Sequence, residues 1–298
     1  MAVLLVLLAT AVGALALVLL RKAMQDGPTH RVLSPGLLFS LLRHRPLWAV
    51  GIAALAVEFC LQVLALANGP VSMVQVLVVL ELPFSLILSR LILGGHLHSR
   101  EWSAVAAMTA GVMVVLVALA PHGGSAAALP ATTWSVGLTI TASAIVAVLV
   151  VGRRSGAGAR TASAGTAAGM TAGLVAVLVK PATAVGLAEV PTTWQTWAAV
   201  AVSAAAFVLL QHALRAGRLV ASQPGITLAN PLVATVWGVA AFHEQVRTGW
   251  WLFAAALGVA LLATGAILLS RSPLLAELQE APAPRHRVDS LATAGARP

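Results

Sequence analysis

The chain has 298 residues, of which 59% are hydrophobic and only 9% are charged, and its mean hydropathy is +0.94. This composition leaves too little polar surface for a water-soluble domain and indicates an integral membrane protein. The formal net charge is +9. The Lys and Arg residues nevertheless lie between apolar segments and form no single basic face, so we expect no nucleic-acid partner.

Long apolar segments follow one another along the chain. A helix needs about 20 apolar residues to cross the roughly 30 Å hydrocarbon core of a bilayer. Such segments cover residues 2 to 20, 47 to 67, 71 to 93, 102 to 120, 132 to 151, 164 to 186, 194 to 214, 218 to 241 and 249 to 270. The sequence therefore predicts an all-α integral membrane protein with about nine transmembrane helices. Most of the eight Trp residues stand at segment edges, which is typical of anchors at the membrane interface.

The stretch from 69 to 102 recurs further along the chain without a gap. Each copy is an apolar segment with a central proline, followed by a short polar loop and a Trp that opens the next segment. The matched pairs are Gly69 and Gly217, Gln75 and Gln223, Pro83 and Pro231, and Trp102 and Trp250. These matches indicate one structural unit used twice. We predict a first transmembrane repeat of four helices (1 to 120), a second of five (132 to 270) and a disordered cytoplasmic tail (271 to 298).

The basic residues predict the orientation of the helices. The first segment has no basic residue before it and is followed by Arg21 and Lys22, which favours an N-terminus outside the cell. With that orientation most Arg residues fall on the cytoplasmic side, and the outer loops hold only Arg247. We expect a multi-pass protein of the inner (plasma) membrane, with the N-terminus outside and the C-terminus cytoplasmic.

This topology places the two copies in opposite directions. The hairpin at Gly69 falls outside, whereas the matching hairpin at Gly217 falls inside. Inverted-topology repeats are typical of alternating-access transporters, in which the two halves exchange conformations. The sequence therefore favours a transporter.

Polar residues deep in the apolar segments define a candidate site. We predict a central cavity that serves as a substrate or ion pathway, lined by Glu58, Gln62, Gln75, Glu81, Gln223 and Asn230. Pro83 and Pro231 lack an N–H, and we predict that each breaks its helix beside the cavity. The glutamates would bind a cation or exchange a proton. The alternative is that these groups are packing contacts bonded to helix carbonyls.

Other polar residues carry weaker signals. Arg90 and Lys180 lie near segment ends and are interpreted as interface anchors. His96, His98 and Glu101 would supply the only catalytic cluster of a membrane enzyme, but this spacing is a weak metal signal, and we predict no metal site, no cofactor and no enzymatic activity. Small residues, Ala107 with Gly111 and Ala254 with Gly258, predict close helix packing.

The hairpin GPVSMVQ running into Pro83, the short loop closed by Arg100, Glu101 and Trp102, and the inverted repeat resemble the drug/metabolite transporter (DMT) superfamily, EamA-like branch. The reduced first repeat is similar to the NIPA-type magnesium transporter group. The resemblance covers about residues 1 to 270. It implies two inverted repeats and secondary transport of small metabolites, drugs or Mg²⁺. Usual members have ten helices and often a Glu after the proline-bearing helix; Glu244 matches this pattern, whereas His96 stands at the equivalent place in the first copy.

We therefore predict a secondary-active permease for a small metabolite, drug-like compound or cation, coupled to protons or ions. A Mg²⁺ transporter and a non-transporting membrane scaffold are the alternatives. The expected partners are the substrate and the lipid bilayer, and the sequence leaves a homodimer open.

Overall fold

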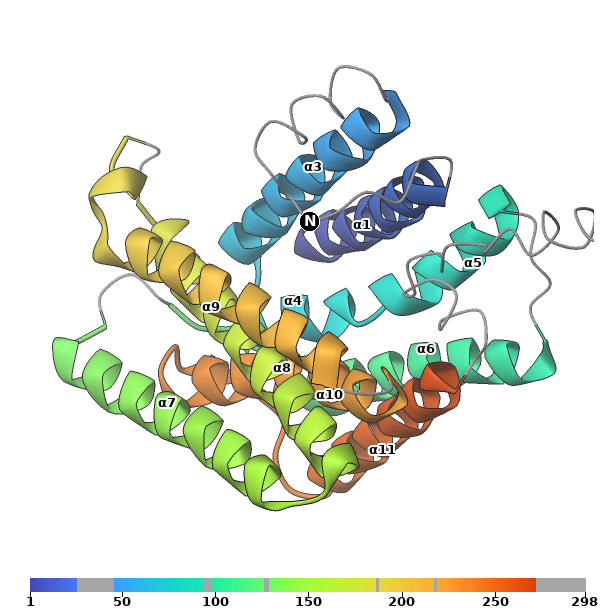
Figure 1. The fold of residues 1–298 in the computed structure, drawn as a ribbon. Coiled ribbons are helices and arrows are strands. Elements are labelled where there is room, and N and C mark those ends of the chain that lie inside the picture. Colours follow the sequence, from blue (N-terminus) through green and yellow to red (C-terminus); the bar gives the residue numbers. More distant parts are fainter. Residues whose placement is uncertain (26–45, 94–97, 126–128, 186–187, 217–218, 272–298) are drawn as a thin grey trace, which may run out of the picture.

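The computed structural model describes residues 1–25, 46–93, 98–125, 129–185, 188–216 and 219–271, and these are almost entirely helical (Figure 1). Most of the predicted tail and His96 lie outside the described residues. The helices are α1 (Ala2–Gln25), α3 (Pro46–Asn68), α4 (Val71–Val78), α5 (Glu81–Leu93), α6 (Ser99–Leu119), α7 (Ala131–Arg154), α8 (Ala157–Ala182), α9 (Trp194–Ala216), α10 (Leu219–Ala240) and α11 (Trp251–Ser270). The short elements are β1 (His122–Gly123), β2 (Glu244–Gln245) and the 3-10 turn η1 (Val190–Thr192).

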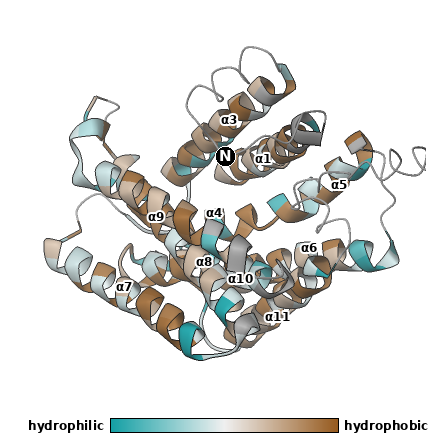
Figure 2. Ribbon diagram, viewed as in Figure 1, coloured by the Kyte–Doolittle hydropathy of each residue, from teal (hydrophilic) through white to brown (hydrophobic). Residues whose placement is uncertain are grey.

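The helices have the length and composition that a membrane requires. Among the described residues, 7 spans are long and apolar enough to cross a bilayer, and α9 adds a shorter apolar stretch, Trp194–Leu210. Hydrophobic residues run along most of the helices, while hydrophilic ones gather mainly towards their ends (Figure 2). The structure thus confirms a helical, multi-pass membrane architecture.

Large apolar side chains point outward as well as inward. Phe253 on α11 is 81% exposed and Ile140 on α7 is 63% exposed. A surface of this kind is suited to lipid. The predicted interface anchors are exposed at Trp102, Trp194, Trp197 and Trp250. Trp134 is instead only 5% exposed and packs edge-on against Trp194 at 5.2 Å between ring centroids.

The predicted segment from 71 to 93 is divided into two helices. The helix is interrupted at Val79 and Leu80, ahead of Pro83, and resumes at Glu81. Pro83 has no N–H to donate to the Val79 carbonyl four residues earlier, and that carbonyl instead accepts from the Leu82 N–H at 3.4 Å. The break predicted at Pro83 is therefore present.

The break predicted at Pro231 is not observed. Helix α10 remains continuous from Leu219 to Ala240 through both Pro224 and Pro231. The physical reason is the close support of helix α8. Glycines 165, 169 and 173 follow one stripe of α8, and a Cβ added at Gly169 would lie only 2.6 Å from the Ile226 carbonyl oxygen of α10. The α10 backbone is therefore held along its length despite its missing N–H groups.

Helices α6 and α11 pack equally closely. A Cβ on Gly111 would lie 2.8 Å from the Gly258 carbonyl oxygen, so the absence of side chains at both glycines lets the backbones meet. The predicted close packing at these two glycines is confirmed.

Three connections meet at one end of the bundle. Strands β1 and β2, which follow α6 and α10, pair antiparallel with His122 opposite Gln245. Glu244 of β2 also contacts Val71 at the start of α4, just after the Gly69 hairpin. The predicted topology assigns all three connections to the outer side of the membrane, and their meeting is consistent with that assignment.

Candidate functional site

A pocket of about 300 Å³, which opens at the surface beside the exposed Phe59 and Ser203, lies between five helices. We call this pocket the cavity. Its residues are Phe59, Gln62, Val63 and Leu66 of α3, Gln75 of α4, Ala172, Val175, Ala176 and Val179 of α8, Ser203 and Ala206 of α9, and Asn230 of α10. The α3 residues follow the spacing of one helix face. The small side chains of α8 and α9 leave the space open. Three of the predicted site residues, Gln62, Gln75 and Asn230, are thus brought together.

Two of the amides come from the consecutive helices α3 and α4, and the third comes from α10, far along the chain. Gln75 is only 2% exposed, although it lies on the short helix α4 next to the lipid-facing α3. Asn230 directly precedes Pro231 in α10, and α10 packs against α4. Because α4 belongs to the first predicted repeat and α10 to the second, the cavity lies where the two predicted repeats meet.

Two acceptor atoms near Pro231 are buried without a hydrogen-bond partner among the described residues. They are Oδ1 of Asn230, which lines the cavity, and Oγ1 of Thr227, one turn earlier. A buried acceptor left without a donor costs about 1–3 kcal/mol. Asn230, the one of the two residues that lines the cavity, is therefore a candidate contact for a bound molecule.

The rest of the cavity wall is apolar. Apart from the three amides and Ser203, the lining side chains are aliphatic or aromatic, and the lining residues include no ionisable group. The cavity can therefore hold a molecule with an apolar body and a hydrogen-bonding group. A fully dehydrated ion would lack compensating charge there.

Neither Glu58 nor Glu81 is among the residues that line this cavity, so it brings together only some of the six predicted residues. Glu58 stands on the flank of α3 that faces α1, where a Cβ on Gly13 would be 2.5 Å from Oε1 and 2.6 Å from Oε2. The Glu58 carboxyl group thus occupies the space that Gly13 leaves open. Glu81 is the first residue of α5, immediately after the break, and neither glutamate is among the cavity-lining residues.

The two glutamates nevertheless lie near each other. Helix α1 packs against both α3 and α5, and Glu58 and Glu81 are close enough for their charges to interact unfavourably. The structure therefore separates an acidic pair beside α1 from the amide-lined cavity.

Gln223 is the sixth predicted residue, and it is buried outside the cavity lining. It lies seven residues before Asn230, which corresponds to about 10 Å along a helix. The two residues share a face of α10, as predicted, but they lie at different positions along the helix axis.

Two residues whose contacts were not anticipated hold the Gly69 hairpin. Lys180 of α8 donates from Nζ to the carbonyl oxygens of Leu66 and Gly69, the second at 2.8 Å. Glu244 accepts from the N–H groups of Val71 and Ser72. The sequence feature that could have predicted these contacts is the start of α4 after Pro70. Pro70 has no side chain that can cap the helix, so the free N–H groups of the first turn need acceptors from elsewhere.

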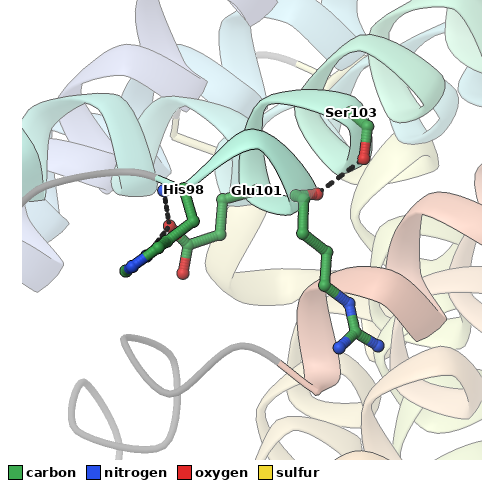
Figure 3. A network of polar contacts seen from close by, with 4 residues as sticks. His98, Glu101 and Ser103 are labelled. Carbon is green, nitrogen blue, oxygen red and sulfur yellow. Dashed lines mark hydrogen bonds and ion pairs between the residues drawn. The ribbon is translucent and has the colours of Figure 1, made fainter.

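His98 and Glu101 cap the N-terminus of α6 (Figure 3). The Glu101 carboxylate accepts from the backbone N–H of His98 at 2.8 Å, and the side chains form a capping box. Among the described residues, no three His, Cys, Asp or Glu side chains gather as a metal site would require. The geometry assigns Glu101 a helix-capping contact.

Comparison with known proteins identifies a distant relative. No family model matches the chain, and no solved structure matches it. An uncharacterized protein of Corynebacterium glutamicum is 26% identical over 235 residues, which cover 76% of this chain and 80% of that protein. This similarity extends over most of both chains and names no activity.

Proposed function

We propose that the chain is a secondary transporter that moves a small amphipathic molecule across the membrane by alternating access. The amide-lined cavity is its substrate site. The observation that carries the proposal is the position of that cavity between α4 and α10, with Asn230 in its wall. The Oδ1 of Asn230 has no hydrogen-bond partner within the described part of the chain. In this proposal the chain has about nine transmembrane helices in two inverted repeats of the DMT, EamA-like type.

The cavity favours transport over a scaffold role. A membrane scaffold needs no pocket between its two halves, and its buried polar groups would be bonded within the protein. Here a space of about 300 Å³ lies among the helices, and two buried acceptors lack protein donors within the described residues. Asn230 lines this space, and a transported molecule with an N–H or O–H group would be a partner for its amide.

The lining also favours an amphipathic substrate over Mg²⁺, the alternative substrate. Mg²⁺ is held by carboxylates and retained waters in near-ideal octahedral geometry. The cavity offers amide groups and aliphatic walls, while the two carboxylates lie beside α1. We assign the Glu58 and Glu81 pair to coupling, as the place where a proton or cation binds during the cycle.

The test is flux into liposomes that contain the purified protein and a pH-sensitive dye. Mg²⁺, amino acids and organic cations are offered separately across an imposed pH gradient. We expect an amino acid or an organic cation, but not Mg²⁺, to cause proton movement. Replacing Asn230 by Ala should lower the initial rate about tenfold, the loss of roughly one hydrogen bond to substrate.

The matched control is Gln245→Ala, which removes an exposed amide in β2 and should leave the rate unchanged. Equal rates for Asn230→Ala and the unmodified protein would remove the cavity from the pathway. Movement of Mg²⁺ alone would select the alternative substrate. Absence of flux for every compound, from protein shown to be folded, would favour the scaffold.

A further inference from the structure

The turn that joins α3 to α4, residues 66 to 72, is held by charged side chains from two distant parts of the chain. Lys180 reaches it from the last turns of α8, and Glu244 reaches it from β2. We call these two residues the clamp. The clamp contacts only backbone groups and one hydroxyl of the turn.

Lys180 holds the end of α3. Its Nζ donates to the carbonyl oxygens of Leu66 and Gly69, which belong to the helix end where carbonyls have no intrahelical partner. A cation there is favoured by the negative end of the helix dipole. Leu66 also lines the cavity, so this contact fixes a cavity wall directly.

Glu244 holds the start of α4. Its Oε1 accepts from the Val71 N–H at 2.5 Å, and its Oε2 accepts from the Ser72 N–H at 3.2 Å and from the Ser72 hydroxyl. The side chain is only 4% exposed. Gln75, a cavity residue, lies one helical turn after Val71.

The surroundings of Glu244 are shaped for this contact. A Cβ on Gly124 would lie 2.6 Å from its Cγ, and a Cβ on Gly238 would lie 2.8 Å from its Cδ. Its charge also attracts that of Lys180. The two clamp residues are thus neighbours that bind opposite ends of one turn.

We propose that Lys180 and Glu244 close this end of the cavity, and that their release from the turn opens it during transport. The inference rests on the proposed function. Alternating access requires the α3–α4 turn to separate from α8 and β2 at this end. The clamp permits this motion because the freed groups are helix termini at the end of the bundle, where water can replace the lost hydrogen bonds.

The test measures access to the cavity and needs no substrate. Cys60, the single cysteine, is replaced by Ser, and Ala176 in the cavity wall is replaced by Cys as a reporter. A charged, membrane-impermeant methanethiosulfonate reagent is applied from one side of sealed vesicles at a time. A separate Thr248→Cys variant, exposed in the loop after β2, identifies the side that carries the clamp.

We expect Glu244→Gln and Lys180→Met to increase the labelling rate at position 176 by about tenfold or more from the clamp side only, because each variant shifts the population towards the open state. Glu189→Gln makes the same chemical change at an exposed carboxylate and should leave the rate unchanged. Ser72→Ala removes one bond of the clamp and should give an intermediate increase, and it decides the question if a stronger variant does not fold.

Unchanged labelling in folded clamp variants would overturn the proposal, as would an equal increase from both sides, which would indicate general loosening. The labelling result is separate from the flux result. If the clamp variants open the clamp side but no compound shows flux, the proposed function is refuted and the clamp proposal stands. Flux without clamp-side opening would refute the clamp alone.

Discussion

Glu58 is accommodated in an apolar helix because the facing residue, Gly13, has no side chain. A carboxyl group in the interior of a bundle needs both space and a polar neighbour. Gly13 supplies the space, since any Cβ there would overlap the carboxyl oxygens. Glu81, after the α4–α5 break, is a second carboxyl group close enough for its charge to oppose that of Glu58. The position of α1 therefore decides where the acidic pair forms.

Replacing Gly13 by Ala should destabilise the protein through this contact. Inserting a methyl group into a filled site typically costs about 1–3 kcal/mol, so the midpoint of thermal unfolding in detergent should fall. Glu58→Ala empties the site. In a protein that already carries Glu58→Ala, adding Gly13→Ala should therefore lower the unfolding midpoint much less than it does in the unmodified protein. Simple additivity of the two substitutions would show that the carboxyl group is not what the methyl group displaces.

Gln62, Gln75 and Asn230, three of the residues that the sequence placed in one cavity, line the same pocket, because helix periodicity and the hairpin at Gly69 constrain which faces meet. It could not separate Glu58 from Gln62, four residues apart on α3. That separation depends on α1 packing against the Glu58 flank, a long-range contact that periodicity does not encode.

Helices α8 and α10 form the tightest backbone contact around the cavity. Gly165, Gly169 and Gly173 each face the α10 backbone, and the same α8 helix presents Ala172 and Ala176 to the cavity. One row of small residues therefore supports α10, and the neighbouring row leaves space for a bound molecule. Asn230 is positioned by the first row and faces the space left by the second.

Replacing Gly169 by Ala should separate the two helices. The new Cβ would lie 2.6 Å from the Ile226 carbonyl oxygen and 2.9 Å from that of Gly225, and backbone atoms cannot move aside as a flexible side chain can. We expect a loss of about 1–3 kcal/mol, measured as a lower unfolding midpoint. Gly158→Ala, on the same helix with no atom within 4 Å of the new Cβ, should be neutral or slightly stabilising. Equal effects of the two substitutions would contradict the close packing.

Proline has different consequences in two matched segments. The sequence predicted interruptions at both Pro83 and Pro231, and only the first is present. That proline lacks an N–H can be read directly from the sequence. Whether the helix then breaks depends on the neighbouring helix, and α10 is supported by the glycine row of α8. The matched sequence positions therefore do not have identical backbones.

At one end of the molecule, the α3–α4 turn, the β1–β2 pair and the end of α8 meet. The charge pattern predicted that these connections share one side of the membrane, and their contacts agree with it. The sequence could not predict that Lys180 and Glu244 join them, because each side chain acts on backbone groups more than 100 residues away.

This end should face the outside of the cell. Arg153 and Arg154 in the last turn of α7 and Arg160 in the first turn of α8 flank the α7–α8 turn, whereas the loop after α10 contains only Arg247. An excess of Lys and Arg marks the cytoplasmic side. In a protein with Cys60 replaced by Ser, a cysteine at Thr248 should react with an impermeant maleimide in intact cells. A cysteine at Ser155, in the α7–α8 turn, should react only after the cells are permeabilised. The reverse pattern would place the clamp on the cytoplasmic side and invert the direction in which its release opens the cavity, while leaving the α8–α10 packing and the cavity itself unchanged.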